Sequence, residues 1–107
     1  MSTSDVITIL CVCANQQEAE TISNKLLQER LIACAHMLPA GQSRFWWKGK
    51  IEISEEVYML LKTRSGKYQV VERMIKRMHS YEVPCVVAYE IKNGSAAFLN
   101  WVRGEAL

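Results

Sequence analysis

The sequence predicts an α+β fold with the element order β-α-β-β-α-β, followed by a C-terminal helix. Three observations lead to this prediction. The 107 residues are half hydrophobic and 22% charged, which is typical of one domain with its own core. Apolar runs rich in β-branched residues alternate with segments whose apolar residues recur at helical spacing. The chain shows no internal repeat, linker or low-complexity segment, so we expect a single domain over residues 1–107.

The first two elements are a buried strand and a helix. Residues 6–13 read VITILCVC and are apolar on both faces, as a central strand requires. Asn15 follows, with Glu18 three residues later, which is the pattern of a helix N-terminus. Apolar residues then recur on one helical face, and we expect this helix to end near residues 30–31.

The middle of the chain predicts strands joined by turns. Pro39 and Gly41 punctuate the second strand. Residues 48–50 read KGK and form a short glycine-containing loop that suits a hairpin. The predicted strands of this region are residues 32–38, 43–47, 51–53 and 57–62.

The last third predicts a helix, a strand and a terminal helix. Residues 68–78 carry an apolar stripe opposite a basic face. Pro84 favours extended backbone at the preceding residue and so ends this region. Residues 85–91 form an apolar strand, and Ser95 caps a short helix that reaches residue 102.

This order is the ferredoxin-like split βαβ arrangement, with an unusually long hairpin between the second and third strands. Its usual sheet is antiparallel, with the fourth strand beside the first and the third between the first and second. The end of the first strand, at Cys11 and Cys13, is therefore expected beside the start of the fourth, at Cys85. Met78 and His79 lead into the same edge.

These five side chains suggest soft-metal chemistry. Thiolate, thioether and imidazole groups favour copper, especially Cu(I), over magnesium or calcium. The alternative is structural, because free cysteine and methionine are ordinary core residues. Cys34 and His36 also share one face of a strand, on the far side of the sheet, where we interpret them as a packed thiol and a hydrogen-bonded histidine.

Composition and motifs exclude several classes of function. A net charge of +2 is too balanced to indicate nucleic acid or an anionic membrane as partner. No apolar run approaches the roughly 20 residues of a membrane span, and the first residues lack signal-peptide features, so we expect a cytoplasmic protein with reduced thiols. Nucleotide-binding, nucleophile-elbow and metalloprotease motifs are absent. His79 and Cys85 form a conceivable base and nucleophile without a third orienting residue, so we expect no enzyme.

Residues 45–47 read FWW and predict self-association. Three consecutive large aromatic side chains cannot all enter one small core, so at least one is expected on the outer face of the hairpin. Pairing with another subunit would cover the hairpin's edges. The alternative is a tryptophan packed under its own hairpin.

Four motifs occur in order along the chain: LIACA at 31–35, FWWKGK at 45–50, MLLKT at 59–63 and HSYEVP at 79–84. Together they resemble the CutA family of small divalent-cation tolerance proteins. The resemblance runs from about Ile7 to Trp101. It implies a ferredoxin-like fold and a homotrimer whose long hairpins pair between subunits, in an architecture similar to that of P-II signalling proteins.

The resemblance also implies a response to copper and other divalent ions. The copper site ascribed to some members matches Cys11, Met78 and His79 here. Met78 stands where some members have a second histidine, and Cys85 follows Pro84 where the family usually has glutamate. These departures favour a soft Cu(I) site over a site for a harder ion.

The sequence therefore predicts a cytoplasmic, non-enzymatic homotrimer that binds copper. The expected ligands are Cys11, Cys85 and His79, with Met78 as an optional fourth. The main alternative is a trimeric scaffold or P-II-like signalling module that binds a small ligand or protein partner in clefts between subunits. A thiol-dependent enzyme is a third, weaker alternative.

Overall fold

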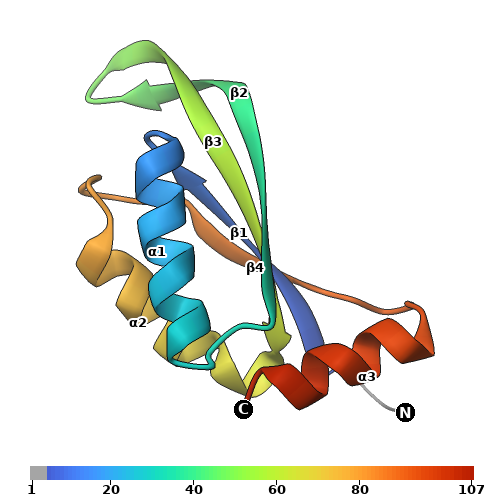
Figure 1. Cartoon of the computed structure of the whole chain (residues 1–107). Coiled ribbons are helices and arrows are strands. Elements are labelled where there is room, and N and C mark those ends of the chain that lie inside the picture. Colours follow the sequence, from blue (N-terminus) through green and yellow to red (C-terminus); the bar gives the residue numbers. More distant parts are fainter. Residues whose placement is uncertain (1–4) are drawn as a thin grey trace.

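The computed structural model describes residues 5–107, which form one sheet and three α-helices (Figure 1). Within these residues no helix has the length and apolar character to cross a membrane. The elements are β1 (Val6–Cys13), α1 (Gln16–Gln28), β2 (Cys34–Trp47), β3 (Lys50–Arg64), a short 3-10 helix (Ser65–Lys67), α2 (Tyr68–Met78), β4 (Val86–Glu90) and α3 (Ala96–Glu105).

The sheet has the order β2-β3-β1-β4 and all its strand pairs are antiparallel, which confirms the predicted topology. Helices α1 and α2 lie beside each other on one face of the sheet (Figure 1). Alternate β1 residues, including Ile9, Cys11 and Cys13, point into the core beneath these helices and are fully buried. Helix α3 packs near the start of β1, where Arg103 contacts Asp5.

Helix α1 begins as predicted and ends earlier than predicted. The Asn15 side chain accepts a hydrogen bond from the Glu18 backbone N–H at 2.8 Å, which caps the N-terminus. At the other end Arg30 has a φ of 58°. The N–H groups of Arg30 and Leu31 donate to the carbonyls of Leu27 and Leu26, the pattern of a Schellman motif. This turn stops the helix at Gln28.

The hairpin strands are longer and less interrupted than predicted. Strands β2 and β3 are continuous over regions that the sequence divides into four runs. Where Pro39 and Gly41 predict an interruption of the second strand, the structure has a β-bulge between Leu38 and Gly41. Ala40 in this bulge has a φ of 61°. A bulge leaves residues out of the ladder, so it accommodates a proline that has no N–H to donate.

The hairpin turn consists of Lys48 and Gly49, because Trp47 pairs with Lys50. Both turn residues have positive φ, at 50° and 82°, as a two-residue type I′ loop requires. Trp46 is 72% exposed near the tip, as expected for at least one residue of the aromatic run. The hairpin extends well beyond the helices (Figure 1).

Candidate metal centre

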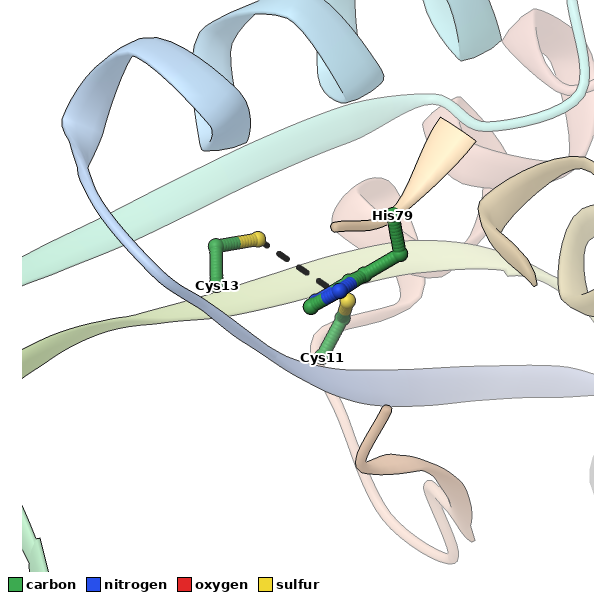
Figure 2. A group of neighbouring side chains, drawn as sticks. All are labelled: Cys11, Cys13 and His79. Atoms are coloured by element: carbon green, nitrogen blue, oxygen red, sulfur yellow. Dashed lines mark hydrogen bonds between the residues drawn. The ribbon is translucent and has the colours of Figure 1, made fainter. Parts of the chain in front are cut away.

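Three potential metal ligands meet at the end of β1, on the face covered by the helices. The Sγ atoms of Cys11 and Cys13 and a ring nitrogen of His79 all lie within 4.8 Å of one another. The two cysteines share a face because they alternate along β1, and His79 is the residue that ends α2. Figure 2 shows the His79 ring lying over Cys11, with Cys13 beside them.

The two thiols are buried and in mutual contact. Their Sγ atoms lie 3.9 Å apart, and both side chains are fully buried. The hydrogen bond with Cys13 and burial both raise the pKa of the Cys11 thiol, and the neighbouring Cys85 adds to the effect. Cys11 is therefore a protonated thiol at neutral pH, and an ion that binds here must displace its proton.

His79 makes a hydrogen bond with each of its ring nitrogens. Its Nε2 lies 2.8 Å from the carbonyl oxygen of Val12, and its Nδ1 accepts from the backbone N–H of Tyr81 at 3.0 Å. Since a carbonyl only accepts and a backbone N–H only donates, these partners fix a neutral ring with its proton on Nε2. Metal binding at His79 must therefore replace one of these two bonds.

Glu18 connects this group to the neighbouring segments. Its carboxylate accepts backbone N–H groups from Ala14 at 2.9 Å and Ser80 at 2.8 Å, and it lies 3.7 Å from Nε2 of His79. Burial raises the pKa of Glu18, but these hydrogen bonds outweigh it and hold the pKa below its ordinary value. Glu18 is therefore an ionised anchor that ties α1 to the segment after α2.

The structure separates Cys85 from this group. Its backbone oxygen accepts from the Val12 N–H at 3.2 Å, so the predicted proximity of the β1 end to residue 85 is present. Val12 alternates with the two core cysteines and so faces the other side of the sheet. Cys85 is exposed, and with Val12 it lines a cavity of about 250 Å³.

Met78 is half-buried against the core and lines a shallow depression with Glu18. The structure thus brings together two members of the expected set, Cys11 and His79, and adds Cys13. The C-x-C spacing on a strand already indicates that the two thiols share a face.

Two cavities lie beside the hairpin. One of about 460 Å³ is lined by Phe45, Trp47 and Ile53 of the hairpin and by Tyr81 and Val83 of the segment after α2. The 250 Å³ cavity shares Phe45, Tyr81 and Val83 with it. These cavities combine aromatic and aliphatic walls with carboxylates, so their chemistry differs from that of the thiol group.

The fold agrees with a family of small divalent-cation tolerance proteins. The sequence profile of the CutA1 divalent ion tolerance proteins matches residues 7–105, and the chain belongs to this family. The divalent-cation tolerance protein CutA of Archaeoglobus fulgidus is 45% identical over 86 residues, covering 80% of this chain and 83% of the relative. That of Pectobacterium atrosepticum is 33% identical over 99 residues, covering 92% and 90%.

Solved structures show the same likeness. CutA from Xylella fastidiosa superposes with a TM-score of 0.93 at 35% identity, covering 96% of this chain and 99% of that one. A structure described as the periplasmic divalent cation tolerance protein CutA from Archaeoglobus fulgidus gives 0.92 at 39% identity, covering 95% and 99%. The predicted family and fold are therefore confirmed.

Proposed function

We propose that this chain contributes to metal tolerance by binding copper as Cu(I) at Cys11, Cys13 and His79. The observation that carries the proposal is the convergence of two thiols and an imidazole within 4.8 Å. Soft sulfur donors favour Cu(I), and this donor set suits a low coordination number. Met78 is proposed as a secondary ligand, since it directly precedes His79 and packs against the same core. Cys85, which the sequence also predicts as a ligand, shares the face of Val12 and so lies on the opposite side of the sheet from Cys11 and Cys13.

Copper binding at Cys11, Cys13 and His79 must displace interactions that the three side chains already make. The ion must displace protons from buried thiols, and it must replace one hydrogen bond of His79. Affinity should therefore fall as the pH is lowered. We propose that the chain acts by binding and not by catalysis.

A competitive Cu(I) titration of the reduced protein tests this site. We expect one tightly bound Cu(I) per chain, lost in Cys11→Ser and Cys13→Ser and weakened in His79→Gln. Cys34→Ser is the matched control, because Cys34 lies on β2 and should leave the tight site intact. Met78→Leu reports whether Met78 acts as a secondary ligand, and Cys85→Ser, on the opposite face of the sheet, should leave the tight site intact. Tight binding that survives both Cys11→Ser and Cys13→Ser contradicts the proposal.

We further propose that the protein is a homotrimer. The support is the apolar surface that one chain leaves exposed, including Trp46 at 72%, Ile51 at 61% and Ile53 at 55% on the hairpin. Light scattering over a range of chain concentrations should give three copies, with weaker assembly in Trp46→Ala. Trp101→Ala on α3, 44% exposed, is the control. A monomer at all concentrations refutes this assembly.

We propose a cytoplasmic location, which suits thiol ligands because the cytosol keeps them reduced. Cell fractionation with a tagged full-length chain tests it. Recovery with periplasmic or exported markers contradicts it.

A second candidate function is binding of a small ligand beside the hairpin. The cavities of about 460 and 250 Å³ favour it, because they adjoin each other through Phe45, Tyr81 and Val83. Native mass spectrometry of the purified protein tests for a retained small molecule. A ligand lost in Phe45→Ala, in a chain that does not bind Cu(I), would favour this function over copper binding.

A further inference from the structure

A second thiol–imidazole pair lies on β2, away from the buried group. Sγ of Cys34 is 3.7 Å from Nε2 of His36. Cys34 pairs with Lys62 of β3, and Lys62 pairs with Thr8 of β1. Paired residues share a face, so Cys34 and His36 lie on the same face as Thr8. Thr8 and Cys11 are three residues apart on β1 and therefore point to opposite faces, so the pair lies opposite Cys11. This is the face that α1 and α2 leave open.

The separation of the two atoms matches the requirement of a zinc ion. Bonds of about 2.3 Å to sulfur and about 2.05 Å to nitrogen, at an angle of about 109°, place the two ligand atoms about 3.5 Å apart. The observed distance is 3.7 Å, so one ion reaches both atoms with almost no movement of the strand. The spacing of residues i and i+2 on a strand fixes this geometry, since both side chains point the same way.

The surroundings also favour access. His36 is exposed and Cys34 is half-buried, so solvent or another chain reaches the remaining coordination positions. Burial raises the pKa of the Cys34 thiol, and the positive charge of Lys62 partly offsets this. His79, in contrast, is closed by hydrogen bonds on both nitrogens.

We propose that Cys34 and His36 form a binding site for Zn²⁺ on the open face of the sheet. The Cys34 thiol loses its proton to solvent, and Zn²⁺ bonds to Sγ and Nε2 in place of the contact between them. Water or the same pair of a second copy fills the other positions. Only this last source of ligands rests on the proposed homotrimer.

Co²⁺ titration of the reduced full-length protein tests the site, because thiolate-bound Co²⁺ has a charge-transfer absorption and Zn²⁺ displaces it. We expect this absorption in the wild type, and an affinity lower by about tenfold or more in Cys34→Ser and in His36→Gln. His36→Gln alters an exposed residue, so it keeps the test valid if Cys34→Ser folds poorly. Circular dichroism checks the fold of each variant.

Cys13→Ser separates this site from the proposed copper site. It should abolish tight Cu(I) binding and retain the Cys34-dependent absorption, whereas Cys34→Ser should do the reverse. One Zn²⁺ per chain supports completion by water, and one per two or three chains supports sharing between copies. An absent absorption, or one unchanged in both Cys34→Ser and His36→Gln, overturns the proposal.

Discussion

Replacing Glu18 by glutamine should destabilise the fold through one lost hydrogen bond. The carboxylate uses Oε1 to accept the Ala14 N–H at 2.9 Å and Oε2 to accept the Ser80 N–H at 2.8 Å. Glutamine has a single acceptor oxygen, so its NH₂ group must face one of these two donors. One backbone N–H in this half-buried region then lacks its partner.

The expected loss in free energy of unfolding is about 2 kcal/mol, because a hydrogen bond to a charged group contributes roughly 1.5–3 kcal/mol. With an m-value of about 1–3 kcal/mol per molar urea, the denaturation midpoint should fall by roughly 1 M. Glu20→Gln is the control on the same helix. Glu20 is exposed and, among residues 5–107, accepts a side-chain hydrogen bond only from Gln16 at 3.1 Å, so its replacement should change stability by less than about 0.5 kcal/mol.

The pKa of Glu18 predicts how the stability difference between wild type and Glu18→Gln changes with pH. The folded-state pKa of Glu18 lies below its ordinary value of 4.5, so its ionised form stabilises the fold above that pH. This stability is lost as the pH falls through the folded-state pKa. The difference between wild type and Glu18→Gln should therefore be largest near neutrality and shrink in acid. Chain concentration is held fixed because association adds to apparent stability. A difference that is constant with pH, or no larger than that of Glu20→Gln, refutes the reasoning.

Three further substitutions test the hairpin and its contacts, each by urea unfolding. Gly49→Ala should cost about 1 kcal/mol from backbone strain alone, since its φ is 82° and a Cβ there meets open space. Gly41→Ala should cost about 1–3 kcal/mol, because its Cβ would lie 2.8 Å from the Tyr58 ring. Tyr81→Phe should cost about 2 kcal/mol, since it removes a 2.6 Å hydrogen bond to the buried Glu56 carboxylate. Burial and that bond raise the pKa of Tyr81 to about 12, so its contribution should persist to pH 10 and be lost as the pH rises through about 12.

The sequence predicts element types and topology well because these depend on local signals. The strand pattern of β1, the Asn15 cap and the apolar stripe of α2 each act within a few residues. The continuity of β2 depends instead on β3, which pairs on both sides of the bulge at Pro39. From the sequence alone, a proline predicts the end of a strand, and only the pairing with β3 shows that β2 continues past it.

The candidate site shows a similar limit. Topology brings Cys11, His79 and Cys85 to one end of the sheet, and this follows from the sequence. Which face each side chain occupies depends on the β1–β4 register, which pairs Cys11 with Val86 and so sets Cys85 opposite Val12. A shift of one residue exchanges the faces, and no local pattern fixes it.

The two thiol–imidazole groups should also differ in how fast they take up metal. At Cys34 and His36 an ion replaces one shared proton on an open face, whereas at His79 a hydrogen bond must break first. Glu18 holds Ser80, the residue after His79, so Glu18→Gln should ease that opening. If opening becomes easier by about 1.4 kcal/mol, Cu(I) uptake at the buried group accelerates about tenfold.

Stopped-flow transfer of Cu(I) from a chelator measures this rate, with Cys34→Ser present in every variant to isolate the buried group. Glu20→Gln should match the parent rate, since it leaves the contacts of Ser80 unchanged. Equal rates in Glu18→Gln and Glu20→Gln would mean that opening around His79 does not limit uptake. The ion would then reach Cys11 and Cys13 without release of the His79 segment, and the hydrogen bonds of its ring would not gate the site.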